Sequence, residues 1–402
     1  MNPRQRVIAA VHHQEPDRVP IDLGGMRATG IMATAYAALK THLGITGGDI
    51  SVYDPGQQLA AVEEPVRAAI GCDVVSLDGG LLDAWRPYIL PDGTPARIGR
   101  GFLTEPDGSG GEYAVDEMGR RHRHRPAASF YFDPLHFPLE EASSAADLES
   151  YSWPLLTDDA LTGLQREARR LDEETEYAIL GAFGGSFIED GQCLRGWTNF
   201  MMDLAADRPF AEAMLDRLLD AHLRNVALYL DAVGDRLQII QVGGDLGTQN
   251  GPQISPRTYE ELIQPRQKAF WTRIHELAPH VAIFLHSCGG IRELLPGIID
   301  AGCDILNPVQ FGARGMNLAD LKREFGNQLC FWGGGCDTQQ VLPFGTPEEV
   351  YHHTRRNVEC LMPGGGFVFC QVHNIQAATP PENIVAMFEA VRDAGVYAGG
   401  ES

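Results

Sequence analysis

A histidine and a cysteine stand two positions apart in the stretch VAIFLHSCGGIRELL, residues 281 to 295, as His286 and Cys288. The apolar letters before them predict a strand and the letters after them predict a helix, so both lie where the backbone turns. Because strand side chains alternate, the two residues face the same side. Imidazole nitrogen and thiolate sulfur are zinc ligands, which predicts a metal site at this turn. The alternative is a buried histidine bonded to backbone beside a core cysteine, since H-x-C is a short pattern.

A catalytic zinc ion usually has three protein ligands and one open position. Cys370 and His373 in FVFCQVHN, and Cys336 in GGGCDTQ, are the candidates for the third ligand. We expect Cys370, because a thiolate is the better ligand for a soft metal and because His373 lies beyond the strand. His373 and Cys336 remain open alternatives.

Acidic and amide side chains follow several other apolar runs. We expect Asp245 to orient a substrate hydroxyl or amine or the zinc-bound group, and Glu189, in GSFIEDGQCLRG, to donate a proton. For both residues a helix cap or a salt bridge is the structural alternative. The other polar residues in these regions that we expect to bind substrate are Asp22, Asp78, Gln249, His373 and Asn374.

Eight apolar runs, most followed by a segment of helical period, predict βα units around a parallel sheet. In a (β/α)8 barrel the active site lies at the carboxyl ends of the strands, which is where the candidate residues occur. We therefore expect one TIM-type α/β barrel over residues 1–402, with amphipathic helices such as 209–233 and 255–278. The runs are RVPIDLGG (18–25), CDVVSLDGG (72–80), YAILGAFGG (177–185), LQIIQVGGD (237–245), VAIFLHSCGG (281–290), CDILNPVQ (303–310), LCFWGGGCD (329–337) and GFVFCQVHN (366–374).

Residues 86–156 interrupt this alternation with Pro, Gly, Arg and aromatic residues. Turn pairs at Asp92-Gly93 and Asp107-Gly108 separate short strand-like pieces, so the segment is predicted to be an insertion of hairpins. An insertion that follows a strand's carboxyl end would lie at the mouth of the barrel. Its run RRHRHR, residues 120–125, is expected to be a solvated turn or a site for an anion or a partner.

The composition excludes several classes of partner. The formal net charge of -22, from 54 acidic and 32 basic residues, repels nucleic acid and anionic membranes. The first twenty residues contain no uninterrupted apolar core, and no window of eighteen apolar residues follows, so we expect a cytoplasmic protein. The eight cysteines are then expected to be free thiols or ligands rather than disulfides.

Three stretches carry a resemblance to a known family. PDRVPIDLGG near the start, GGDLGTQNGPQISPRTYEELIQPRQKAF in the middle and VHNIQAATPPENIVAMFEAV at the end resemble the uroporphyrinogen decarboxylase superfamily. The resemblance runs from about residue 3 to residue 395 and is weakest across the insertion. It implies a (β/α)8 barrel independently of the strand count, and decarboxylase relatives imply a homodimer.

Two activities of the superfamily differ by motif. The decarboxylase branch has a loop R-Q-A-G-R-Y for the carboxylates of its tetrapyrrole, whereas this chain has GGMRATGIMATAY, with only Arg27 matching. Arg27 is therefore carried over as a substrate-binding residue, and several carboxylates would lack a partner. The cobalamin-dependent methyltransferases have H-x-C-G after the fifth strand, which HSCG matches at His286, Cys288 and Gly289.

The methyltransferase branch implies a zinc ion, a corrinoid carried by a partner protein, and a methyl ether, methylamine or thiol as the small substrate. Zinc there activates a thiol for attack on methyl-Co(III), or a methyl donor for attack by Co(I), and the direction stays open here. In that branch a cysteine ligand lies six residues before the final T-P, a position that His373 occupies in this chain. Either the histidine replaces the thiolate or a local shift lets Cys370 serve. A metal-free uroporphyrinogen-type decarboxylase, using Asp22 or Asp78, is the alternative activity.

Overall fold

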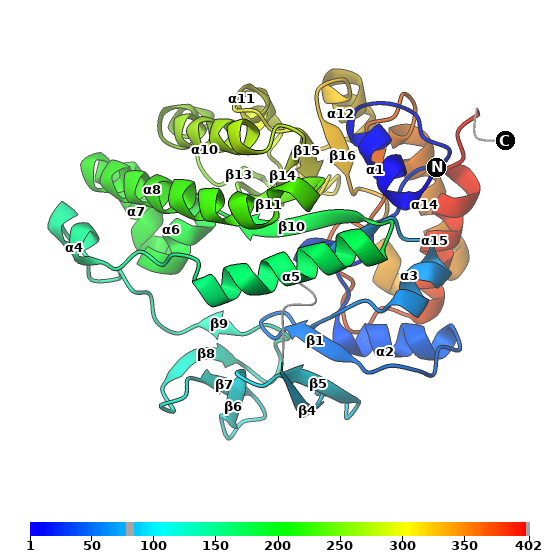
Figure 1. Cartoon of the computed structure of the whole chain (residues 1–402), viewed down its shortest axis with the longest axis horizontal. Coiled ribbons are helices and arrows are strands. Elements are labelled where there is room, and N and C mark those ends of the chain that lie inside the picture. Colours follow the sequence, from blue (N-terminus) through cyan, green and yellow to red (C-terminus); the bar gives the residue numbers. More distant parts are fainter. Residues whose placement is uncertain (78–83, 399–402) are drawn as a thin grey trace.

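A curled parallel sheet surrounded by helices forms the body of the protein, in a computed structural model that describes residues 1–77 and 84–398 (Figure 1). Seven parallel strands lie in the order β17, β16, β15, β14, β11, β10, β3. This is the predicted TIM-type architecture. Their bounds are β3 (Val74–Ser76), β10 (Ala178–Gly184), β11 (Ile239–Val242), β14 (Ala282–His286), β15 (Ile305–Asn307), β16 (Cys330–Trp332) and β17 (Phe367–Val368).

The segment predicted as the first strand lies between the two edges of this sheet. Ile21 forms an isolated parallel bridge with Phe369, just after β17. On the other side, the backbone N–H of Asp73, just before β3, donates to the Ile21 carbonyl at 2.8 Å. Residues near Ile21 thus occupy the eighth position of the barrel, although the pairing is too short to count as a regular strand.

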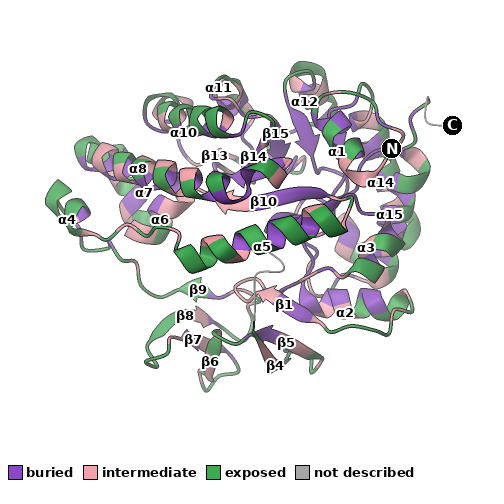
Figure 2. Ribbon diagram, in the orientation of Figure 1, coloured by how far each residue is buried: buried purple, intermediate pink, exposed green. Residues whose placement is uncertain are grey.

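Amphipathic helices cover the outside of the sheet, with buried faces turned inward and exposed faces outward (Figure 2). Their N-termini carry the expected caps: the Thr157 side chain accepts from the Ala160 N–H, and Thr346 forms a capping box with Glu349. No helix of the described residues is long and apolar enough to cross a membrane. The main helices are α5 (Asp158–Glu174), α8 (Arg208–Val233), α10 (Gln264–Leu277), α12 (Leu318–Phe325), α14 (Pro347–Leu361) and α15 (Pro381–Ala394).

The helix predicted over residues 255–278 is divided. It begins as α9 (Pro256–Thr258), capped by Ser255, continues as a π-helical turn over Tyr259–Ile263, and becomes regular in α10. Pro265 lies in the first turn of α10 and has no N–H to donate to the carbonyl of Glu261. A proline inside a helix removes one hydrogen bond and its ring crowds the preceding turn, which accounts for the local widening.

Alternation along the strands separates two apolar clusters. Phe284, like Trp332 and Cys370, belongs to the cluster inside the barrel. Ile283 and Leu285 belong to the larger cluster beneath the helices. His286 is two positions beyond Phe284, so the period of the strand turns it toward the interior side at the carboxyl end of β14.

The residues of the predicted hairpin insertion form antiparallel strands on one side of the barrel (Figure 1). One four-stranded sheet has the order β2, β1, β5, β4, and the other has the order β6, β7, β8, β9. Two strands of the first sheet lie earlier in the chain than the predicted segment. The bounds are β1 (Ser51–Asp54), β2 (Leu59–Ala60), β4 (Trp85–Ile89), β5 (Pro95–Gly99), β6 (Leu103–Pro106), β7 (Glu112–Val115), β8 (Arg121–Arg125) and β9 (Asp133–Pro134).

Candidate metal and substrate site

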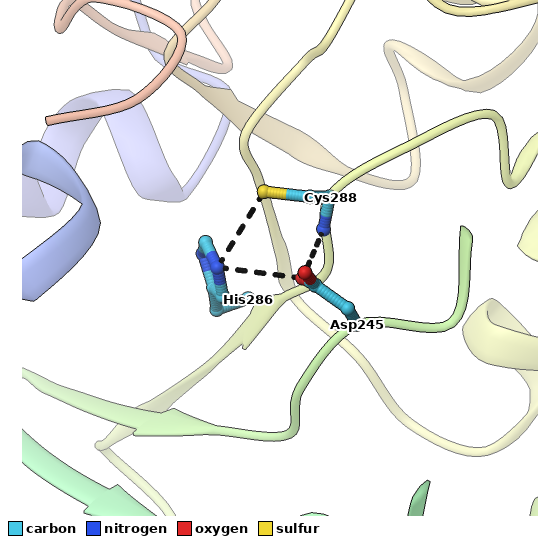
Figure 3. Close-up of side chains that lie close together, drawn as sticks. All are labelled: Asp245, His286 and Cys288. Atoms are coloured by element: carbon cyan, nitrogen blue, oxygen red, sulfur yellow. Dashed lines mark hydrogen bonds and ion pairs between the residues drawn. The ribbon is translucent and has the colours of Figure 1, made fainter. Parts of the chain in front are cut away.

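Three side chains converge at the carboxyl ends of β11 and β14 (Figure 3). The ligand atoms of Asp245, His286 and Cys288 all lie within 4.8 Å of one another. His286 Nε2 is 3.6 Å from Asp245 Oδ1 and 3.8 Å from Cys288 Sγ. Ligands held about 2.0 to 2.3 Å from one tetrahedral zinc ion lie roughly 3.3 to 3.8 Å apart. The three donors are thus spaced closely enough to share an ion.

Backbone contacts between two loops hold this group together. The Cys288 N–H donates to Asp245 Oδ1 at 2.7 Å, and the Leu246 N–H donates to Ser287 Oγ at 2.9 Å. Gly289 has φ +90°, and a Cβ there would collide with the backbone of Gly247. Glycine therefore lets the loop after β14 lie directly against the loop after β11.

Asn307 fixes the orientation of the His286 ring. Its Oδ1 accepts from His286 Nδ1 at 2.8 Å, while its Nδ2 donates to the Trp332 carbonyl at 2.8 Å. A carboxamide oxygen can only accept, so the proton of the neutral ring is on Nδ1. Nε2 then presents its lone pair toward Asp245 and Cys288, as a metal-binding histidine requires.

The Cys370 thiol lies behind this arrangement. It is fully buried inside the barrel, and its Sγ is 3.8 Å from Asn307 Nδ2, on the other end of the carboxamide from His286. Among the described residues the group within metal-binding distance contains Asp245 and does not contain Cys370. Cys336 is buried too, with Sγ 3.9 Å from the Asp337 carbonyl, and is likewise outside the group.

The electrostatic surroundings of the group are acidic. Burial, followed by the Asp245 carboxylate, raises the pKa of the Cys288 thiol. Burial and the same carboxylate also raise the pKa of Glu189. A Cβ on Gly244 would collide with the Glu189 carboxylate, so Glu189 lies against the backbone just before Asp245. A bound cation would offset this concentration of acidic groups.

His373 provides a second imidazole at the same place. Its ring centroid is 6.5 Å from that of His286, and its Nδ1 is 3.1 Å from Asn374 Oδ1. Burial, followed by the nearby His286, lowers the pKa of His373. Asn374 is held in turn by Gln57, whose Oε1 accepts from Asn374 Nδ2 at 2.7 Å. Gln57 lies between β1 and β2, so the sheet that contains these strands helps to position a side chain of the site.

Two cavities flank the group. The larger, about 890 Å³, is lined by Glu189, Asp245, His286 and His373 and by residues of the β1 to β9 region, including Tyr131. The other, about 490 Å³, is lined by Cys288 and also by His373. Both volumes fall in the range of small-molecule sites. A substrate could therefore approach the three donors from either side.

The other predicted site residues have different surroundings. Arg27 lines the larger cavity and its Nε pairs with Asp54 Oδ2 at 2.5 Å. Gln249 and Asn374 line the smaller cavity. Asp22 lines neither: it is fully buried, and its carboxylate accepts from Trp332 Nε1 at 2.9 Å and from the Gly25 N–H at 2.8 Å. Asp78 lies outside the described residues.

Two features of the site were not predicted from the sequence. Asn307 ends an apolar run, but nothing in its local pattern indicates that it contacts His286. Asp245 was expected to orient the substrate or the zinc-bound group rather than to bind the metal, and its place among the donors depends on the loop that carries it across to Cys288. Asp245 follows two glycines at a strand end, which marks a turn but does not give its direction.

A family model described as uroporphyrinogen decarboxylase (URO-D) matches residues 139–394. A methylated-thiol–coenzyme M methyltransferase of Methanosarcina mazei is 30% identical over 144 residues, 35% of this chain and 34% of that protein. This match thus spans about a third of that relative's length. A uroporphyrinogen decarboxylase of Alkalilimnicola ehrlichii is 24% identical over 394 residues, 96% of this chain and 93% of that protein.

Among solved structures, a methyltransferase from Methanosarcina mazei is similar along nearly the whole chain. The TM-score is 0.61 at 17% sequence identity, and the alignment covers 98% of this chain and 99% of that one. At this identity the likeness establishes a shared barrel fold.

Proposed function

The chain belongs to the uroporphyrinogen decarboxylase family, and from this premise we propose that it is a zinc-dependent methyltransferase. It moves a methyl group between a small methylated compound, which is a methyl ether, a methylamine or a thiol, and a corrinoid held by a partner protein. The observation that carries this proposal is the convergence of His286, Cys288 and Asp245 within 4.8 Å at the carboxyl end of the barrel. The similarity to a methylated-thiol methyltransferase supports the same reaction class.

The residues present fit a zinc ion. An imidazole with its free nitrogen aimed at the group, a thiol and a carboxylate form a three-ligand set of the kind that leaves a fourth position for substrate. We assign the third ligand to Asp245, because Cys370 Sγ lies on the far side of Asn307 from His286. Zinc bound there would polarise the sulfur, oxygen or nitrogen that carries or accepts the methyl group.

The chain's own residues then divide the remaining tasks. Glu189, whose pKa is raised by burial and by Asp245, lines the larger cavity and is assigned as the proton donor to a leaving group there. His373 and Asn374 are fixed by their mutual hydrogen bond and offer polar contacts to the substrate. Gln249 lines the smaller cavity, next to Cys288, and binds substrate from that side.

Metal analysis tests this proposal directly. Purified wild-type protein is expected to contain about one zinc per chain, and the His286→Ala and Cys288→Ala variants are expected to lose it. Cys336→Ala, which removes a buried thiol outside the group, is the matched control and should keep its zinc. Methyl transfer is then followed through the visible spectrum of a corrinoid protein. Wild-type protein that has been reconstituted with zinc and binds none would overturn the assignment.

A metal-free uroporphyrinogen-type decarboxylase is the second candidate, because a decarboxylase relative aligns with 96% of this chain. Its substrate carries many carboxylates, whereas the lysines and arginines among the described residues that line the larger cavity are Arg27 and Arg123, and Arg27 is already paired with Asp54. Most of the substrate carboxylates would therefore lack a cationic partner in this cavity, which is costly for a buried charge. Incubation with the porphyrinogen and chromatography of the products distinguishes the two activities, since metal-free carbon dioxide release would favour the decarboxylase.

A further inference from the structure

A third cavity, of about 690 Å³, lies between α5, α8, α6 (Ile188–Arg195) and the end of β10. Most of its lining is apolar, and the aromatic and leucine side chains there include Trp153, Phe183, Tyr229, Leu164 and Leu218. The Phe183 and Tyr229 rings meet edge to face at 5.4 Å. No lysine or arginine is among the described residues that line it. Its size and lining match a site for a small apolar molecule rather than for an anion.

The outer wall of this cavity is held in place by hydrogen bonds. Asn225 of α8 accepts from the Leu156 N–H at 2.8 Å and donates to the Pro154 carbonyl at 3.0 Å. Trp153 Nε1 donates to the Leu148 carbonyl at 3.1 Å. The segment before α5 is thereby fixed over the cavity, so ligand binding would not include an entropic cost for ordering this segment.

One end of the cavity is polar. His222 Nε2 is 3.4 Å from Asp190 Oδ2 and 3.3 Å from the Ser186 carbonyl. Burial lowers the pKa of His222 to about 4, so its ring is neutral near pH 7. Burial, followed by Glu189, raises the pKa of Asp190 to about 7, although two fifths of its side chain is exposed. This end can therefore exchange hydrogen bonds with a neutral polar group.

The cavity shares a border with the larger cavity of the main site. Gly184, Gly185, Asp190 and Cys193 line both spaces. Gly184 and Gly185 have φ values of +86° and +76°, and the pairing of β10 with β11 shifts register between Ala182 and Gly184. A bulged strand end with two glycines leaves little side-chain volume between the two spaces.

We propose that this cavity is a second small-molecule site, which binds a neutral ring compound carrying one hydroxyl group. The ring lies against Phe183 and Leu218, and the hydroxyl group meets Asp190 and His222. Aromatic and aliphatic walls favour a flat ring, and the Asp190 carboxyl group at the polar end, with no lysine or arginine among the described lining residues, disfavours an anion. This second site requires none of the three metal-binding donors, so it can be tested independently of the methyl-transfer proposal.

Titration calorimetry with 4-methylphenol as the probe tests this site, with 4-methylbenzoate as an anionic probe of similar shape. Ala221→Phe fills the cavity from α8, and Leu164→Trp fills it from α5. Ala227→Phe is the matched control, since Ala227 lies on the same helix but is outside the cavity lining. Circular dichroism and the thermal midpoint identify which variants fold, and the His286→Ala variant supplies a protein without the proposed zinc site.

The wild type, the Ala227→Phe protein and the His286→Ala protein should bind 4-methylphenol with equal affinity. Either filled variant that folds should bind at least tenfold more weakly, and 4-methylbenzoate should bind the wild type at least tenfold more weakly. Absence of saturable binding, undiminished affinity in a folded filled variant, or equal affinity for the anion would each overturn the proposal. If His286→Ala loses zinc but still binds 4-methylphenol, the result supports both proposals and shows that the two sites are independent.

Discussion

Asn307 is the residue on which the chemistry of His286 depends most directly. Asn307 lies on the Nδ1 side of the His286 ring, and the proposed metal lies on the Nε2 side. Its Oδ1 accepts a hydrogen bond from Nδ1 at 2.8 Å, which selects the tautomer with Nε2 free. We expect Asn307→Leu to weaken zinc binding by about 10- to 100-fold, the usual effect of losing such a partner. Competition with a chromogenic chelator measures this affinity.

Asn383→Leu is the matched control for that prediction. Asn383 is a buried carboxamide that donates to the Leu342 and Gly345 carbonyls, in a part of the fold that does not line the site. Its substitution should lower stability and leave zinc affinity unchanged. Equal zinc affinity in Asn307→Leu and the wild type would mean that the histidine is oriented by something else.

Asp22 is predicted to affect stability rather than metal binding. Burial raises its pKa from 3.8 to about 6, against the opposing hydrogen bonds from Trp332 and Gly25. The folded protein then keeps a proton that the unfolded chain releases, so this residue's contribution to stability is full below about pH 4 and is lost as the pH rises through 6. Two pKa units correspond to about 2 to 3 kcal/mol.

Urea unfolding between pH 4 and pH 7 measures this contribution. The wild-type midpoint should fall over this interval relative to that of Asp22→Asn, which cannot ionise. The comparison removes the effects of all other carboxylates, because both proteins contain them. Parallel pH profiles would show that Asp22 titrates normally in the folded protein.

At the scale of elements, the site depends on two loops that touch. Gly289 has φ +90° where the loop after β14 meets Gly247 and Thr248. Gly289→Ala should lower the free energy of unfolding by about 1 to 3 kcal/mol, since an alanine there is strained and displaces the neighbouring loop. Zinc affinity should fall with it, because the same loop carries Cys288. Gly312→Ala, at a position with open space and no positive φ, should change neither quantity.

Local patterns predicted those elements whose causes are local. His286 and Cys288 are two positions apart, so strand alternation places them on one face, and this could be predicted from the sequence alone. That this face is the interior one follows only from the structure, where Phe284 belongs to the inner cluster and Ile283 and Leu285 to the outer one. The π-helical turn was not predicted, although Pro265 could have indicated it. The pairing of Ile21 with Phe369 joins residues 348 positions apart, so no window of sequence contains its cause.

At the scale of the molecule, the candidate site is assembled from separate segments. His286 and Cys288 come from one strand end, and this pair could be predicted from spacing. Asp245 reaches them because its loop is bonded to Cys288 and Ser287. Cys370 was preferred as a ligand from its chemistry, yet the closed barrel puts Asn307 between it and the histidine. The residue types that can bind a metal can be recognised in a sequence. How far each side chain lies from the proposed metal site is decided by the folded barrel.

Closure of the barrel depends on a charged cluster at the end opposite the site. Asp73 is fully buried, pairs with Arg6 at 2.5 Å and Arg18 at 2.7 Å, and accepts from the Ile21 N–H at 2.8 Å. Asp73→Ala should lower the free energy of unfolding by about 3 to 5 kcal/mol, because it leaves the buried Arg6 without this partner and removes the bond to the closing segment. Asp172→Ala, which breaks a more exposed pair with Arg4, should cost at most about 1 kcal/mol. Urea unfolding compares the two, and equal small effects would mean that other contacts close the barrel.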